Sequence, residues 1–195
     1  FIWGDIGIGK TSFVNVVRHT ALNSGLFTPF KEIAVQQDWS IDDFMLNTIS
    51  AIYSTLKLLK DRPISETTFK KLESLFSIGR TSLNIGVSIA GSGGNYGKQE
   101  NPTEQLTTFN LEQFFNELVL EIVDNTKKEI IIHYNNLELL PEKKVRYIFD
   151  NLRDFFQTKG IHFVFVGNLT VHSIIQSIPR FFSNLTDTPF HIEIL

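Results

Sequence analysis

Apolar residues recur along the chain in two patterns, one typical of buried strands and one typical of amphipathic helices. Short apolar runs predict strands at 1–3, 31–36, 129–134, 161–166 and 190–195. Between these runs, apolar positions at the helical period predict helices over 11–23, 41–60, 66–76, 111–122, 142–157 and 171–178. Strands that alternate with helices predict an α/β fold, a three-layer, doubly wound parallel sheet of about five strands.

Three further segments add detail to this pattern. Ser40 and Asp43 have the spacing of a capping box at the start of the helix over 41–60. Residues 83–89 alternate apolar with small or polar residues, as a half-buried strand does. The glycine-rich stretch 91–105 follows, and we expect a flexible loop there, because no Lys-Thr or Lys-Ser pair follows its glycines at phosphate-loop spacing.

The sequence GDIGIGKT, from Gly4 to Thr11, matches the phosphate-loop pattern G-x-x-x-x-G-K-[ST] between a strand and a helix. Its glycines let backbone N–H groups turn toward an anion, and the new helix adds its positive end. In this motif Lys10 reaches the β- and γ-phosphates and the Thr11 hydroxyl ligates Mg²⁺. The nucleotide-binding residues expected from the motif are Gly4, Asp5, Ile6, Gly7, Ile8, Gly9, Lys10, Thr11 and Ser12.

Composition narrows the function classes. The chain has 195 residues, of which 42% are hydrophobic and 20% charged, as expected of one globular domain over 1–195. A net charge of −3 gives no support for nucleic-acid binding by this segment. The absence of cysteine excludes disulfides and thiolate metal sites. No apolar run approaches the roughly 18 residues that span a bilayer, and no signal peptide is present, so we expect a cytoplasmic protein without membrane contact.

Two more apolar strands end in polar residues that complete a candidate site. The strand EIIIHY is followed by Asn135-Asn136, the strand HFVFVG by Asn168, and the segment SIPRFFSNL contains Arg180. Over nearly the whole chain this arrangement resembles P-loop ATPases of the AAA+ and STAND type and is similar to archaeal Orc/Cdc6-like ATPase domains. The resemblance implies that Asn168 senses the γ-phosphate and that Arg180 acts as an arginine finger. Each has a structural alternative, because Asn168 can cap the next helix and Arg180 can pair with a local carboxylate.

The chain departs from that family at Asn135-Asn136, the Walker B position, where the pattern has acids. An asparagine can offer its carbonyl to Mg²⁺, as we expect of Asn135, or orient water, as we expect of Asn136, but it cannot accept a proton as a base. Glu138 is the nearest carboxylate and matches a third acid of some STAND proteins. It would act as a base only if its loop folds back toward the γ-phosphate. His133 is expected to be a hydrogen-bonded core residue and not a metal ligand.

These features predict an ATP-binding switch module, with ATP and Mg²⁺ as cofactors and weak or slow hydrolysis. ATP is favoured over GTP because no guanine motif is present; the nearest string, at 125–128, lacks the aspartate. We expect the chain to be a fragment of a longer multidomain protein, with its other domains and self-association as partners, and the resemblance implies a signalling role. Two alternatives stay open: an active ATPase that uses Glu138 or a partner-supplied acid, and a DNA-associated initiator-like ATPase.

Overall fold

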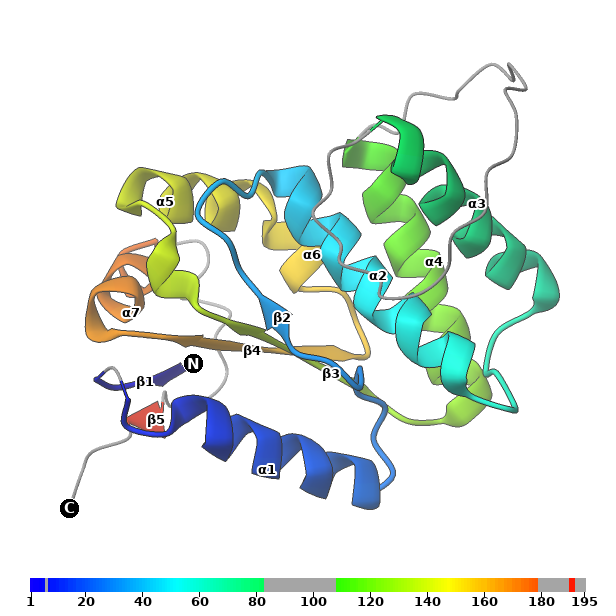
Figure 1. Cartoon of the computed structure of the whole chain (residues 1–195), viewed down its shortest axis with the longest axis horizontal. Coiled ribbons are helices and arrows are strands. Elements are labelled where there is room, and N and C mark those ends of the chain that lie inside the picture. The colour runs from blue at the N-terminus through cyan, green and yellow to red at the C-terminus, as the bar shows by residue number, and fades with distance from the viewer. Residues whose placement is uncertain (6, 83–107, 179–189, 192–195) are drawn as a thin grey trace.

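Five parallel strands form one sheet in the order β2-β3-β4-β1-β5. The computed structural model describes residues 1–5, 7–82, 108–178 and 190–191 (Figure 1). The strands are β1 (Ile2–Trp3), β2 (Ile33–Ala34), β3 (Ile130–Asn135), β4 (Ile161–Gly167) and β5 (Phe190–His191). The α/β fold and the parallel sheet predicted from the strand and helix pattern are confirmed.

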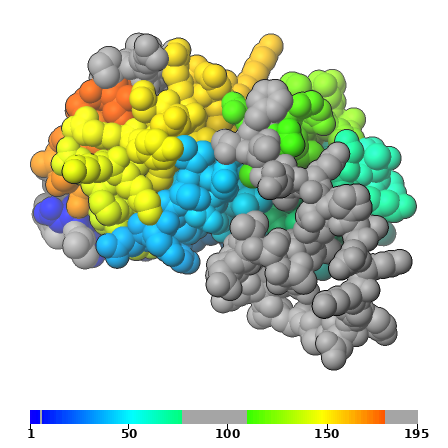
Figure 2. Space-filling model, turned by 90° about the horizontal axis from the view of Figure 1, so that it is seen from above, coloured from blue at the N-terminus to red at the C-terminus, as the bar shows by residue number. Residues whose placement is uncertain are grey.

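Helices cover both faces of the sheet. The helices are α1 (Lys10–Asn23), α2 (Ile41–Leu58), α3 (Glu66–Ser82), α4 (Thr108–Thr126), the 3-10 helix η1 (Leu137–Leu139), α5 (Glu142–Asn151), α6 (Arg153–Phe156) and α7 (Leu169–Gln176). α1 lies on one face, and α2, α4 and α6 lie on the other (Figure 1). Figure 2, viewed from above, shows the surface of α2, α4 and α5, whereas α1 lies on the opposite side.

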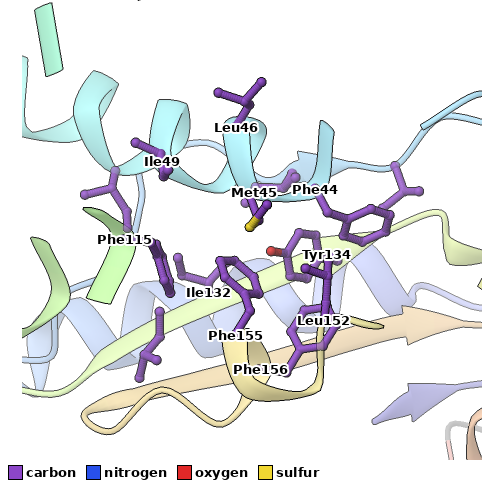
Figure 3. Packing of buried hydrophobic residues seen from close by; sticks show 14 of the residues in the cluster. Phe44, Met45, Leu46, Ile49, Phe115, Ile132, Tyr134, Leu152, Phe155 and Phe156 are labelled. Carbon is purple, nitrogen blue, oxygen red and sulfur yellow. The ribbon is translucent and has the colours of Figure 1, made fainter. Parts of the chain in front are cut away.

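β3 divides its side chains between these two layers. Ile132 and Tyr134 point toward α2 (Figure 3). The Thr48 hydroxyl on that helix donates to the Phe44 carbonyl oxygen, so the buried Tyr134 hydroxyl is the donor in its bond to Thr48. Because successive strand residues point to opposite faces, His133 and Asn135 face α1. Five of the six β3 residues are buried, as expected of a strand covered on both faces.

Aromatic rings fill the core between the sheet and α2, α4 and α6. The Phe115 and Phe155 ring centroids are 4.3 Å apart, and those of Tyr134 and Phe165 are 5.7 Å apart and stacked. Figure 3 shows Phe155 and Phe156 beneath the side chains of α2. The buried phenylalanines of this layer therefore serve core packing.

Two expectations about the helices have clear outcomes. The capping box at α2 is confirmed, since the Asp43 N–H donates to Ser40 Oγ at 3.2 Å and the Ser40 N–H donates to the Asp43 carboxylate at 2.7 Å. The prediction of a single helix over 142–157 is wrong, because two helices, α5 and α6, cover this range. The chain leaves helical geometry at Leu152 (φ −94°, ψ 21°), and the resulting bend allows both Phe155 and Phe156 to be buried.

Several boundaries differ from those predicted. The strand expected over 31–36 has only two residues, because after Val35 the chain turns away toward the cap of α2. The helix expected to end at 76 continues to Ser82, and the one expected over 171–178 begins at Leu169. The strand predicted at 83–89 and the loop at 91–105 lie outside the described residues, as does most of the strand predicted at 190–195.

The buried ring of Phe115 provides a test of the core. Phe115 on α4 is fully buried, whereas Leu120 on the same helix is 50% exposed. Phe115→Ala should lower the free energy of unfolding by about 3–5 kcal/mol, because it removes contacts and leaves a cavity. Leu120→Ala is the matched control and should change it by less than about 1 kcal/mol. Urea denaturation followed by circular dichroism measures both; equal losses would contradict the packing described.

Candidate nucleotide site

The carboxyl ends of β1, β3 and β4 lie at the same edge of the sheet. β1 pairs with β4 through Ile2 with Val166 and Trp3 with Gly167, and β3 pairs with β4 in parallel register. The loop that leaves β1, the start of η1 and the start of α7 therefore gather at this edge (Figure 1). Ligands of open α/β sheets bind outside the carboxyl ends of the strands, so this edge is the candidate site.

The loop between β1 and α1 depends on glycine for its backbone conformation. Gly7 has φ 82° and Gly9 has φ 93°, both in the left-handed region. A Cβ at either position would meet no atom within 4 Å, so the requirement for glycine comes from the dihedral angles and not from crowding. A side chain there would cost roughly 1–2 kcal/mol.

The N-terminus of α1 carries no side-chain cap and no acid in its first turn. By contrast, Ser40 caps α2 and Asn168 caps α7. The first N–H groups of an α-helix have no partner inside the helix, and together with the helix dipole they favour an anion. The start of α1 therefore offers its amides to a bound anion.

Lys10 lies in this loop as a buried cation. Its side chain is only 8% exposed, and its Nζ donates to the carbonyl oxygens of Gly4 at 2.9 Å and Asp5 at 2.8 Å. Within the described part of the chain, Lys10 forms no ion pair. Burial of a cation without a counter-ion is costly, so a phosphate at the loop would relieve an unbalanced charge.

The Asn135 side chain joins the end of β3 to the phosphate loop. Its Nδ2 donates to Thr11 Oγ1 at 2.9 Å and to a carboxylate oxygen of Glu32 at 3.3 Å, while its Oδ1 accepts from the Asn136 N–H at 3.0 Å. Thr11 and Asn135, the two metal-binding candidates, are thus in direct contact. In this orientation the amide nitrogen faces Thr11, so ligation of Mg²⁺ by the Asn135 carbonyl needs a half-turn of the amide.

A family model, described as the KAP family P-loop domain, matches residues 2–188. The chain belongs to the KAP family of P-loop domains. This assignment confirms the P-loop NTPase fold and supports nucleotide binding at the loop, while the AAA+, STAND and Orc/Cdc6 affinities stay predictions. No curated protein matches the chain. In the described residues of this KAP domain, every helix is too short or too polar to cross a membrane.

Asn136 and Glu138 lie just beyond β3 in the KAP domain. Asn136 immediately precedes η1 and adopts a left-handed conformation (φ 63°, ψ 31°), which asparagine tolerates better than most residues. Glu138 is half-buried, and its Oε2 is buried without a hydrogen-bond partner. η1 packs against β4 and α7. Among the described residues no hydrogen bond joins Glu138 to the phosphate loop, so its role as a base stays a prediction.

Asn168 caps the helix that follows it, which is the structural alternative to a sensor role. Its Oδ1 accepts from the Val171 N–H at 3.0 Å and caps α7. Contact with a γ-phosphate stays a prediction. Arg180 and Ile6, both expected at the site, lie outside the described residues.

His133 is buried beneath α1 in the KAP domain. Only 2% of it is exposed, and burial together with the charge of Arg18 lowers its pKa to about 4, so the ring is neutral at pH 7. Its burial agrees with the predicted core role, but Nε2 has no hydrogen-bond partner, contrary to the expected hydrogen-bonded residue. Across the described residues, no group of three or more His, Asp or Glu side chains is placed to hold a metal.

Two charged residues near the site were missed by the sequence argument. Glu32 contacts Asn135 from the segment that enters β2, and Arg18 on α1 donates to the carbonyl oxygen of Pro29 and to Asn15 Oδ1. Burial lowers the pKa of Arg18, and the nearby charge of Glu32 partly opposes that shift. The sequence does contain one indication of Glu32, because it is the only acid in the segment predicted as a strand at 31–36.

The neutral His133 predicts a pH-dependent stability. The pKa of His133 is lower in the folded state than in the unfolded state. The contribution of the neutral ring to the free energy of unfolding is therefore fully present above pH 6.5 and is lost as the pH falls toward 4. The loss should amount to roughly 3 kcal/mol at most. In His133→Gln this part of the decrease should disappear, as urea denaturation between pH 7 and pH 4 would show. The exposed His162 provides the control, since His162→Gln should keep the steep decrease due to His133.

A conservative change separates the two roles of Asn168. Asn168→Ser keeps a good helix cap but removes the amide, whereas Asn168→Ala removes both. The serine variant should unfold like the wild type, and the alanine variant should lose about 1 kcal/mol. If Asn168 only caps α7, the serine variant should also bind and hydrolyse nucleotide like the wild type. A selective loss of turnover in Asn168→Ser would instead support a sensor role.

Proposed function

We propose that this KAP domain is an ATP-binding switch, whose nucleotide occupancy sets the conformation or assembly of a larger protein and whose hydrolysis of ATP is slow. One observation carries the proposal. The contact between Asn135 and Thr11 puts an uncharged amide beside the hydroxyl that would ligate magnesium, in a loop whose sequence matches the phosphate-loop motif in full. The loop supports binding, and the amide argues against rapid chemistry.

Binding would use groups that the structure leaves ready for an anion. The amides of the loop and of the first turn of α1 would surround the phosphates. Lys10 would exchange the carbonyl oxygens of Gly4 and Asp5 for phosphate oxygens. Thr11 Oγ1 would help to hold Mg²⁺, which when bound neutralises charge on the β- and γ-phosphates. The donor set fits the ion, since Mg²⁺ prefers oxygen ligands.

Slow hydrolysis follows from the residues at the end of β3. Asn135 and Asn136 cannot take a proton from an attacking water. Glu138 belongs to η1, which packs against β4 and α7. The bound nucleotide would therefore persist until it is released or slowly cleaved, which suits a switch in a signalling protein of the cytoplasm.

Loss of Lys10 tests the binding half of the proposal. Lys10→Ala should weaken ATP binding at least about tenfold, because a charge-assisted contact is worth about 1.5–3 kcal/mol. Lys143→Ala, on the exposed surface of α5, is the matched control and should bind like the wild type. Titration with a fluorescent ATP analogue measures both. Equal affinity of the Lys10 variant and the wild type would contradict the assignment of the loop.

Restored acids test the hydrolysis half. Asn135→Asp with Asn136→Asp should raise ATP turnover by roughly 10²-fold or more, since a positioned base contributes about that much. Aspartate is chosen at 136 because it tolerates the left-handed conformation found there. Phosphate release with saturating Mg-ATP is the measurement. Rapid, Lys10-dependent release by the wild type would overturn the slow switch, and Glu138→Gln would then test the active-ATPase alternative.

A further inference from the structure

Glu32 places a carboxylate beside the two residues expected at the magnesium position. Its Oε2 accepts from Asn135 Nδ2 at 3.3 Å, and the same nitrogen donates to Thr11 Oγ1 at 2.9 Å. These two distances from one nitrogen place the two oxygens at most about 6.2 Å apart. The Glu32 side chain is exposed, so a ligand at this edge can reach it.

The register of the sheet explains why Glu32 points to this place. β2 pairs with β3 through Ile33 with Tyr134 and Ala34 with Asn135, and the Val35 N–H donates to the Asn135 carbonyl at 2.9 Å. Strand residues alternate between faces, so Glu32 and Ala34 share the α1 face with Asn135. The pairing of β2 with β3 therefore brings the carboxylate to the Asn135 amide, which also contacts Thr11.

Two contacts outside the sheet hold the chain that enters β2. The Arg18 guanidinium on α1 donates to the Pro29 carbonyl oxygen from one side. Thr55 on α2 accepts from the Phe30 N–H at 3.0 Å from the other. The segment that leads to Glu32 is therefore tied to both helical layers.

The shared amide also shows what a cation would do here. Asn135 Nδ2 now supplies the positive hydrogens that face the Thr11 hydroxyl and the Glu32 carboxylate. A half-turn of the amide would replace these hydrogens by Oδ1, and three oxygens, from Thr11, Asn135 and Glu32, would then face one another. Such a set suits Mg²⁺, which is held by one or two carboxylates together with phosphate oxygens.

We propose that Glu32 supplies the carboxylate that holds the magnesium ion of bound ATP, directly or through a water, in place of the acid that β3 lacks. This assignment rests on the proposed ATP-binding function. Glu32 would give the site a negative charge, while Asn135 and Asn136 at the end of β3 would still be unable to accept a proton. The charge strengthens binding of the metal complex and leaves hydrolysis slow.

The test compares ATP affinity with magnesium and with EDTA, using a fluorescent ATP analogue. Glu32→Gln should reduce the magnesium-dependent gain in affinity about tenfold, and in EDTA it should bind as well as the wild type or better, because a negative charge near the phosphates is gone. Glu117→Gln, an exposed position on α4, is the matched control and should keep the full gain. Glu32→Gln combined with Asn135→Asp should recover the gain, because the acid is then supplied by β3.

A second measurement reports on the metal itself. Mn²⁺ in place of magnesium, followed by electron paramagnetic resonance of the ATP complex, should bind more weakly in Glu32→Gln and normally in Glu117→Gln. Thermal unfolding checks that each variant is folded; if Glu32→Gln is not, Glu32→Asp replaces it, and its shorter side chain should lose part of the gain.

The outcomes separate the two proposals. Unchanged magnesium dependence in Glu32→Gln, with Lys10→Ala still losing ATP, would overturn the role of Glu32 and leave the switch intact. Failure of the wild type to bind ATP in either condition would overturn the switch, and the assignment of Glu32 with it.

Discussion

The alternation of side chains along β3 is the constraint on which the rest of the structure depends. Because β3 is buried on both faces, each residue must suit the layer that it meets. Tyr134 meets the aromatic core and donates its hydroxyl to Thr48 on α2. Asn135, one residue later, meets the polar start of α1. A shift of the register by one residue would exchange these environments, so the core and the site specify the same pairing.

The candidate site has an open end, where an anion is expected to bind, and a tightly connected end, where the metal is expected. At the first, α1 begins without a cap, and Lys10 is buried against carbonyl groups alone. At the second, the Asn135 amide joins α1, β2 and β3 through Thr11, Glu32 and its own strand. Phosphate binding would change the partners of Lys10, and metal binding would change those of Asn135. Under the proposed function, both changes would alter contacts of α1, with the phosphate loop in the first case and with β3 in the second, and a nucleotide would thereby act on the conformation of the domain.

Charge around the site is balanced by residues that the phosphate-loop motif does not include. Arg18 acts on both Glu32 and His133: its charge opposes that of the carboxylate and adds to the effect of burial, which is the main cause of the lowered pKa of His133. The buried Nε2 of His133 and Oε2 of Glu138 have no hydrogen-bond partner. Unsatisfied buried groups are costly, but Arg18, Thr28, Arg153 and His172 carry such atoms as well, so these two do not by themselves mark the site.

Local patterns determined much of this protein. The phosphate loop, the capping box of α2 and the apolar runs of β3 and β4 each depend on residues adjacent in the chain, so the sequence by itself determined them and the fold class that follows. It also identified Asn135 as a neighbour of Thr11. The sequence did not predict the break at Leu152 or the contact of Glu32 with Asn135. Both depend on long-range packing: the first on the burial of Phe155 and Phe156, the second on the pairing of β2 with β3 across 103 residues, and only the tertiary structure decides which distant segments meet.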